Sequence, residues 1–271
     1  MNYKDEIKAI VFDFDGTLID FDYKASDYTR LALEKLKDSK YKICLASGRP
    51  CFLAIKAFTN TFGDYPLDYI FGCNGSEMMD VKNNEINLLS LFKAEDVRYL
   101  GKELDADYLV LGIYEGFNFL VNREVKDQEL KDWCDARWLK PVVYDFSKNE
   151  VDRSKVICLN CAKDRERQIE FVNTKDLSRF CAEYSTKNCF EIQSFGVNKG
   201  KAMDELAKTL GCDNKNILSF GDMANDLSML INSTGVAMGN ATEDVKAAVK
   251  LRTDDVKNKG VYQFLHDNEL I

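Results

Sequence analysis

The sequence predicts an α/β protein: a Rossmann-like, doubly wound parallel sheet with an α+β domain inserted into it. Three observations support this fold class. Short apolar runs alternate with helical stretches near both ends of the chain, and each run ends in a polar or glycine-containing turn. Continuously apolar runs are typical of strands that are buried on both faces of a parallel sheet. The middle of the chain instead contains apolar runs in pairs, which predicts a different kind of domain there.

Residues 1–81 supply the first part of the predicted sheet. Its expected strands are Ile7–Phe12, Tyr41–Ala46 and Tyr69–Cys73, with a helix over Asp27–Lys37. Strands that alternate with helices along the chain are typical of parallel sheets with helical crossovers.

Residues 190–271 resume this pattern. We expect a helix over Lys199–Leu210, a strand over Ile217–Phe220, a helix from about Asn225 and a strand over Gly235–Met238. The ligand crevice of such a sheet lies beyond the carboxyl ends of its strands. The polar turns that follow the strands are therefore expected to meet in one site.

The inserted domain is predicted to span residues 82–189. Two apolar runs, Tyr108–Tyr114 and Phe117–Val121, are joined by Glu115-Gly116, a tight turn that predicts a hairpin. Helices are expected over Ala94–Leu104 and Val125–Trp133.

Composition excludes several classes of partner. The net charge is −8, and the chain has no basic block of the kind that binds nucleic acid or anionic membranes. Its amino terminus lacks the apolar stretch of a signal peptide, and no apolar run is long enough to span a membrane. We expect a cytoplasmic protein that binds neither nucleic acid nor membrane.

Cysteine and histidine also narrow the chemistry. The nine cysteines lie mainly in apolar segments, which favours reduced thiols over a disulfide framework. Cys158 and Cys161 have the spacing of a metal knuckle, but there is no second pair, so we expect neither metal nor redox chemistry there. The only histidine, His266, lies near the end of the chain, and a Ser-His-Asp triad or a histidine zinc site would lack its parts.

Carboxylates follow two of the predicted strands. Asp13 and Asp15 are two residues apart at a strand end, so their side chains should leave on the same side. Like charges so close together favour a hard divalent cation such as Mg²⁺. Asp222 offers a third carboxylate, and Asp226 lies about one helical turn further on. The sequence therefore predicts a magnesium site.

Phosphoryl transfer suits this group of residues. Asp13 can attack phosphorus to give an aspartyl-phosphate, and Asp15 can protonate the leaving alkoxide and later deprotonate water. The transferred group also needs hydrogen-bond donors. The candidates are Lys199, the Ser47 hydroxyl, and the backbone N–H groups of Phe14 and Gly48.

Four motifs resemble those of the haloacid dehalogenase superfamily of phosphatases, in its Cof-type branch. They are Asp13-Phe14-Asp15-Gly16-Thr17-Leu18, Ser47-Gly48-Arg49, Asn198-Lys199-Gly200, and Gly221-Asp222-Met223-Ala224-Asn225-Asp226. The similarity extends to Gly235–Ala241. Between Ser47 and Lys199 there is room for a cap domain, so the resemblance implies a cap of the second type, which selects the substrate.

The resemblance also implies roles for the site residues. Asp13 would be the nucleophile, Asp15 the acid/base whose backbone carbonyl binds Mg²⁺, Asp222 the third protein ligand, and Asp226 a supporting carboxylate. Phosphate contacts would come from Phe14, Ser47, Gly48, Lys199 and Asn225.

We therefore expect a Mg²⁺-dependent phosphatase that hydrolyses a small phosphorylated metabolite, for example a sugar phosphate. Two alternatives stay open at this point: a phosphotransferase or mutase with the same aspartyl-phosphate chemistry, and a non-catalytic sensor of a phosphorylated ligand.

Overall fold

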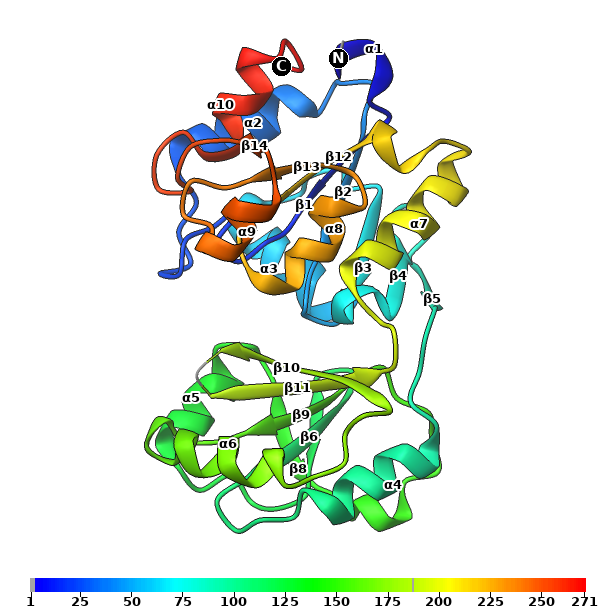
Figure 1. The fold of residues 1–271 in the computed structure, drawn as a ribbon, viewed down its shortest axis with the longest axis vertical. Helices are drawn as coiled ribbons and strands as arrows, with labels where there is room; N and C mark the ends of the chain where they lie inside the picture. The colour runs from blue at the N-terminus through cyan, green and yellow to red at the C-terminus, as the bar shows by residue number, and fades with distance from the viewer. Residues whose placement is uncertain (1–2, 187) are drawn as a thin grey trace. The chain divides into compact units, whose positions relative to one another are not determined.

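A computed structural model describes residues 3–186 and 188–271, and the chain divides into two compact units (Figure 1). Unit 1 contains Met1–Leu89 and Asn198–Ile271, and unit 2 contains Ser90–Val197. The predicted boundaries of the inserted domain, at residues 82 and 189, each lie about eight residues before the boundaries of unit 2 in the structure. The difference arises because β5 (Glu85–Leu88) pairs with β4 (Glu77–Asp80) in the sheet of unit 1, and β11 (Cys189–Ser194) pairs with strands of unit 2.

Within the described residues, unit 1 is built on an eight-stranded sheet of order β14-β13-β12-β1-β2-β3-β4-β5. Its first six strands in this order are parallel, and β4 and β5 are antiparallel additions at one edge. The predicted α/β class is confirmed. The other strands are β1 (Ala9–Phe12), β2 (Lys42–Ala46), β3 (Tyr69–Gly72), β12 (Ile217–Gly221), β13 (Thr234–Ala237) and β14 (Leu251–Arg252).

Helices connect the parallel strands in two directions away from β1. The chain moves through β2 and β3 on one side of β1, and through β12, β13 and β14 on the other. Because such crossovers are right-handed, the two sets of helices cover opposite faces of the sheet. The helices of unit 1 are α1 (Tyr3–Glu6), α2 (Asp27–Leu36), α3 (Cys51–Phe62), α7 (Lys199–Leu210), α8 (Leu227–Ile231), α9 (Glu243–Ala248) and α10 (Gly260–Asp267), with 3₁₀ turns η1 (Cys73–Gly75), η4 (Asn214–Asn216) and η5 (Ala224–Asp226).

The strand register brings the polar turns to one edge of the sheet. Phe12 lies opposite Phe220 of β12 and Leu45 of β2. Asp13 directly follows β1, and its N–H donates to the Phe220 carbonyl at 3.0 Å. The strand order reverses at β1, which is where open α/β sheets form their ligand crevice.

Buried aromatic rings fix β1 in the centre of the sheet. Every residue of Ala9–Phe12 is buried, as expected for a strand covered on both faces. Phe12 stacks on Phe220 with ring centroids 5.3 Å apart, and Phe220 meets Phe264 of α10 edge-on at 5.8 Å. Full burial of one such side chain contributes about 1.5–3 kcal/mol, so the strand that carries Asp13 is firmly held.

Unit 2 contains, among its described residues, a six-stranded sheet of order β10-β11-β9-β6-β7-β8. Its apolar core joins the sheet to Val97 and Leu100 of one helix and Val172 of another. The expected hairpin is present, and Gly116 in its turn has a φ of +58°. The elements are α4 (Ala94–Glu103), β6 (Val110–Glu115), β7 (Asn118–Val121), α5 (Gln128–Asp135), β8 (Lys140–Val143), η2 (Phe146–Lys148), β9 (Val156–Leu159), η3 (Ala162–Asp164), α6 (Arg165–Asn173) and β10 (Phe180–Thr186).

No helix within these described stretches is long and apolar enough to cross a lipid bilayer.

Candidate active site

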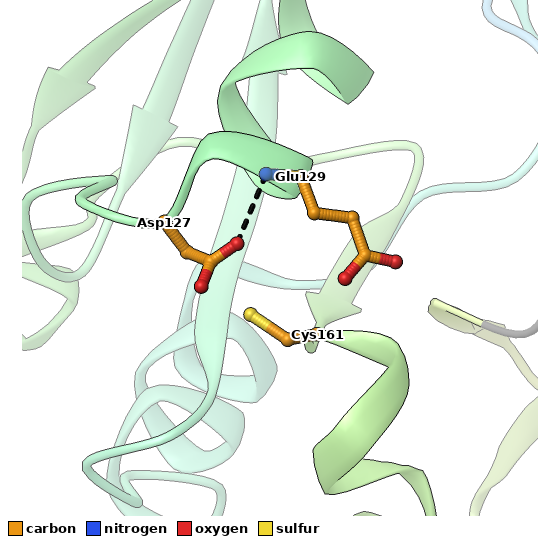
Figure 2. A group of neighbouring side chains, drawn as sticks. All are labelled: Asp127, Glu129 and Cys161. Atoms are coloured by element: carbon orange, nitrogen blue, oxygen red, sulfur yellow. Dashed lines mark hydrogen bonds between the residues drawn. The ribbon is translucent and has the colours of Figure 1, made fainter.

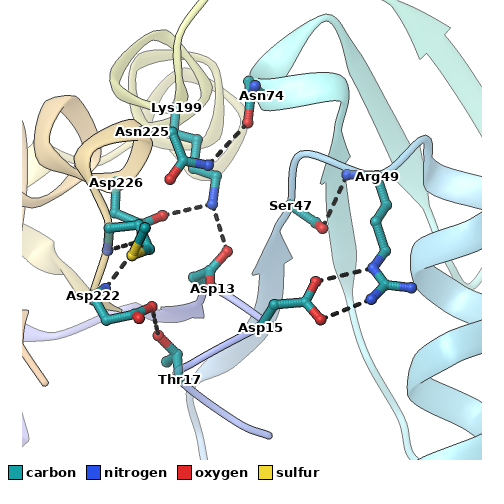
Figure 3. A network of polar contacts seen from close by, with 11 residues as sticks. Asp13, Asp15, Thr17, Ser47, Arg49, Asn74, Lys199, Asp222, Asn225 and Asp226 are labelled. Carbon is teal, nitrogen blue, oxygen red and sulfur yellow. Dashed lines mark hydrogen bonds and ion pairs between the residues drawn. The ribbon is translucent and has the colours of Figure 1, made fainter. Parts of the chain in front are cut away.

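A buried lysine joins two carboxylates at the carboxyl edge of the sheet of unit 1 (Figure 3). The Lys199 Nζ lies 2.5 Å from Asp13 Oδ1 and 2.6 Å from Asp226 Oδ1. Burial opposes the charge of this ammonium group, but the two carboxylates outweigh burial and hold the pKa of Lys199 above its ordinary value. The lysine is therefore a fixed positive charge beside Asp13.

Helix α7 positions this lysine. Lys199 is the first residue of the helix, and the Asn198 side chain caps the helix by accepting from the Lys201 N–H at 3.1 Å. The buried residues of α7 include Ala202, Met203 and Leu206. Packing of this apolar face directs the amino end of α7, and with it Lys199, toward Asp13.

Three carboxylates form a cluster around the lysine. Asp13, Asp222 and Asp226 are buried, and each offers a carboxylate oxygen such that these oxygens all lie within 4.8 Å of one another. The second oxygen of Asp226 accepts the N–H groups of Asp222 and Met223, both at 3.0 Å. These bonds close the turn after β12 and direct Asp222 toward Asp13.

The cluster carries more negative charge than Lys199 can compensate. Burial, followed by the charge of Asp226, raises the pKa of Asp13 to about 7. Burial, followed by the charges of Asp13 and Asp226, raises the pKa of Asp222 to about 8. A hard divalent cation prefers oxygen ligands of this kind and would supply the missing positive charge. The donor set therefore fits a divalent metal.

Two further side chains orient Asp222. The Thr17 Oγ1 donates to Asp222 Oδ1 at 3.3 Å, and the Asn240 Nδ2 donates to Asp222 Oδ2 at 3.3 Å and to the Gly16 carbonyl at 2.8 Å. Glycine is required at position 16 because its φ is +90° and a Cβ there would lie 2.2 Å from Asp222 Oδ2. The turn after β1 and the turn after β12 are thus fitted to each other.

Asp15 does not join this cluster. Its carboxylate accepts two hydrogen bonds from Arg49, from Nε at 3.0 Å and from Nη2 at 2.7 Å, as Figure 3 shows. The sequence predicts a cation site built from Asp13, Asp15, Asp222 and Asp226. The structure brings the carboxylates of Asp13, Asp222 and Asp226 together, whereas that of Asp15 pairs with Arg49. The role of Asp15 as acid/base, and of its backbone carbonyl as a metal ligand, stays a prediction.

The predicted phosphate donors lie around the same edge. Ser47 is buried, and its Oγ accepts the Arg49 N–H at 3.1 Å. Asn225 donates to Asn74 Oδ1 at 3.4 Å, and the Asn74 N–H donates to the Ser47 carbonyl at 3.0 Å. Phe14, whose side chain is buried, and Gly48 lie in the turns after β1 and β2. Their phosphate-binding roles stay predictions.

Four site residues were missing from the predicted set or had no definite role in it. They are Arg49, Asn74, Asn240 and Glu77, whose carboxylate accepts the Cys51 N–H at 2.9 Å and so holds the loop after β2. Each lies within three residues of a glycine next to a strand end. That pattern is also typical of ordinary turns, which is why it gave only a weak signal.

A second group of possible metal ligands lies in unit 2 and consists of Asp127, Glu129 and Cys161 (Figure 2). Its carboxylates have structural partners. Asp127 caps α5 by accepting the Glu129 N–H at 2.9 Å, and Glu129 accepts the Ala162 N–H at 3.0 Å. Local capping thus explains the positions of the two carboxylates in this cluster.

All nine cysteines are free thiols. Cys158 accepts a hydrogen bond from Gln168 Nε2 at 3.4 Å in the core of unit 2.

Comparison with known proteins identifies the family. Residues 10–265 match the haloacid dehalogenase-like hydrolase family. The 5-amino-6-(5-phospho-D-ribitylamino)uracil phosphatase YcsE of Bacillus subtilis is 26% identical over 263 residues, which cover 94% of this chain and 93% of the relative.

Solved structures share the fold. A haloacid dehalogenase-like hydrolase from Bacteroides thetaiotaomicron matches with a TM-score of 0.83 and 23% identity over 96% of this chain and 99% of that one. The HAD subclass IIB sugar phosphatase BT4131 matches with a TM-score of 0.77 and 23% identity over 97% of this chain and 100% of that one. With the family match over most of its length, the chain belongs to the haloacid dehalogenase superfamily and is a Cof-type phosphatase.

Proposed function

We propose that this phosphatase uses Mg²⁺ and hydrolyses a small phosphorylated metabolite through an aspartyl-phosphate on Asp13. One observation carries the proposal: Asp13 stands at the carboxyl end of the central strand, in contact with Lys199 and inside a cluster of buried carboxylates. A buried, negatively charged cluster at a strand end is costly to fold, and such arrangements are typical of catalytic sites.

In the proposed reaction an Asp13 oxygen forms a bond to phosphorus while the bond to the leaving oxygen breaks, and Asp15 gives that oxygen a proton. A water oxygen then attacks phosphorus, its proton passes to Asp15, and the bond between phosphorus and Asp13 breaks. Both aspartates return to their starting states. The products are inorganic phosphate and the dephosphorylated alcohol.

The hydrogen-bond donors around Asp13 would stabilise the negative charge that spreads over the transferred phosphoryl group. Lys199 is assigned to a phosphate oxygen because its ammonium is buried, charged and 2.5 Å from the nucleophile. Ser47, Asn225 and the backbone N–H groups of Phe14 and Gly48 complete the predicted set. Asp13, Asp222 and the backbone carbonyl of Asp15, with Asp226 in support, would hold Mg²⁺, which would neutralise carboxylate charge and polarise a phosphate oxygen.

The substrate class rests on the relatives. The Bacillus subtilis relative is named for a phosphorylated ribitylamino-uracil, and the structural neighbour BT4131 is named a sugar phosphatase. Both names describe phosphate esters of small, polyhydroxylated metabolites. We propose the same class of substrate for this chain and name no individual compound.

Initial rates on a panel of sugar, polyol and nucleotide phosphates, with Mg²⁺ and with chelator, test the proposal. We expect hydrolysis that requires Mg²⁺, and loss of at least about a thousandfold in kcat for Asp13→Asn. Asp5→Asn is the matched control because Asp5 is an exposed aspartate 3.8 Å from Lys40 on the surface.

Three results would contradict the proposal. A rate of hydrolysis that chelator leaves unchanged would show that the reaction does not require Mg²⁺. Transfer of phosphate to a second alcohol at the expense of water would indicate a phosphotransferase or mutase. Binding of phosphorylated ligands with no turnover on any ester would indicate a sensor.

A further inference from the structure

The Asp15 carboxylate is held on both of its oxygens by a single arginine. Arg49 Nε donates to Oδ2 at 3.0 Å and Nη2 donates to Oδ1 at 2.7 Å. This two-point geometry fixes the plane of the carboxylate as well as its position, which a single hydrogen bond does not. Asp15 is 38% exposed, so packing alone would leave its side chain free to change rotamer.

Arg49 is itself fixed in the loop after β2. Its N–H donates to Ser47 Oγ at 3.1 Å, and its carbonyl accepts the Cys73 N–H at 2.9 Å. Its guanidinium lies 5.6 Å from the centre of the Phe14 ring, within the range of a cation–π contact. Phe14 is the residue between Asp13 and Asp15, and its ring is buried. The arginine side chain, 12% exposed, is therefore tied to the strand end that carries both aspartates.

The proposed reaction requires Asp15 to act twice at one place. It gives a proton to the leaving oxygen, stays ionised through the covalent intermediate, and takes a proton from the attacking water. If the carboxylate rotated away after the first proton transfer, it would no longer contact the attacking water. Two hydrogen bonds from one guanidinium, one to each oxygen, oppose that rotation.

We infer that Arg49 is a positioning residue, which holds the Asp15 carboxylate in place for proton transfer in both steps of the reaction. This inference rests on the proposed function. Because Arg49 acts through Asp15, its removal should lower kcat/KM most for esters whose leaving group needs a proton. A residue that bound the substrate directly would instead change KM, whatever the leaving group.

The test compares kcat/KM for two esters, because this ratio reports steps only up to departure of the leaving group. One ester is p-nitrophenyl phosphate, whose phenolate leaves without a proton. The other is the alkyl phosphate that wild type hydrolyses fastest in the metabolite panel. The variants are Arg49→Gln, Arg49→Lys, Asp15→Asn and the double variant Asp15→Asn/Arg49→Gln.

Arg30→Gln is the matched control. Like Arg49, Arg30 lies over a phenylalanine ring, 5.5 Å from the centre of Phe62, but it donates to the Thr61 carbonyl at 2.8 Å. Circular dichroism and thermal unfolding of every variant separate a loss of positioning from a loss of fold.

We expect Arg49→Gln to lose at least about tenfold more kcat/KM on the alkyl ester than on the nitrophenyl ester, as for the loss of a general acid. Arg49→Lys should lose less, and Arg49→Gln should cost nothing further in the Asp15→Asn background. Equal losses on both esters, a rise in KM that accounts for the loss, or an additive double variant would overturn the inference alone. A wild type that hydrolyses neither ester would overturn the proposed function, and the inference with it.

Discussion

Gly16 has little room because the turn after β1 meets the Asp222 carboxylate. A Cβ at this position would lie 2.2 Å from Asp222 Oδ2 and 2.6 Å from its Cγ. The Gly16 carbonyl also accepts from Asn240, which contacts the same carboxylate. The geometry of the carboxylate cluster therefore depends on the absence of a side chain at residue 16.

Gly16→Ala should lower kcat by at least about tenfold and weaken Mg²⁺ binding, because the methyl group would displace Asp222. The left-handed backbone and the clash together should lower the free energy of unfolding by about 1–3 kcal/mol. Gly63→Ala is the control, since Gly63 has a φ of +75° with nothing within 4 Å of a Cβ. Equal activity for the two variants, measured by steady-state rates and calorimetric Mg²⁺ titration, would argue against a fitted turn.

The sequence predicts which residues meet at the site better than how their side chains pair. Asp13, Lys199, Asp222 and Asp226 follow strand ends or begin a helix, and parallel strands bring such positions together. The pairing of Asp15 with Arg49 depends on side-chain rotamers and on the distance between two loops. Neither quantity follows from spacing along the chain.

At the scale of elements, the turn η1 joins two parts of the site. Cys73 and Asn74 both have positive φ values, +49° and +53°, which is uncommon for residues other than glycine. The Asn74 N–H holds the Ser47 carbonyl, and its side chain accepts from Asn225. The strained backbone thus connects the loop after β2 with the turn after β12, and strain of this kind is concentrated at functional sites.

Asn74→Gly should keep the backbone conformation but remove the acceptor for Asn225, so we expect kcat/KM to fall by about tenfold with a change in unfolding free energy below about 1 kcal/mol. Asn84→Gly is the matched control because Asn84 has a φ of +54° in the exposed turn between β4 and β5. An Asn74→Gly variant as active as Asn84→Gly would show that this turn has no role in the reaction.

The apolar pattern predicts the positions of helices and strands closely where a whole strand or one full face of a helix is buried. The expected helix Lys199–Leu210 coincides with α7, and the expected strand Ile217–Phe220 with β12 to within one residue. The strand β5 was not expected, because Glu85–Leu88 is exposed throughout and lacks an apolar run. Its pairing with β4 is made by backbone hydrogen bonds, which the side-chain pattern does not report.

At the scale of the whole molecule, the carboxylate cluster should couple stability to pH. In the unfolded chain Asp13 and Asp222 have ordinary pKa values of 3.8, whereas folding raises these pKa values to about 7 and about 8. The folded state then binds more protons between these limits, so the free energy of unfolding decreases as pH rises through this window. Metal binding requires the ionised carboxylates and should have the opposite pH dependence.

We therefore expect the Tm of the metal-free protein to fall between pH 5 and pH 8, and Mg²⁺ to raise Tm much more at pH 8 than at pH 5. Differential scanning calorimetry across this range, with Mg²⁺ and with chelator, measures both effects. Asp222→Asn should flatten both dependences. A Mg²⁺ effect of equal size at all pH values would place the cation away from these carboxylates.

The division into two units was expected from the change in strand pattern, but its boundaries were not. β11 begins with the apolar residues Cys189 and Phe190, like the buried strands of unit 1, but it also contains Glu191 and Gln193. In the structure it pairs antiparallel with β9 and β10 of unit 2. Which sheet a short strand joins depends on contacts far along the chain. Composition near residue 189 therefore could not locate the boundary.

Isolation of the covalent intermediate tests directly whether Asp13 is the nucleophile. Wild-type enzyme is acid-quenched during turnover of a good ester in Mg²⁺, digested with pepsin, and searched by mass spectrometry for a phosphoryl group on the peptide that contains Asp13. We predict the phosphoryl group on Asp13, and none in Asp13→Asn, whose folding is checked by circular dichroism. Full activity of Asp13→Asn, or turnover with the phosphoryl group on another residue, would show that Asp13 is not the nucleophile.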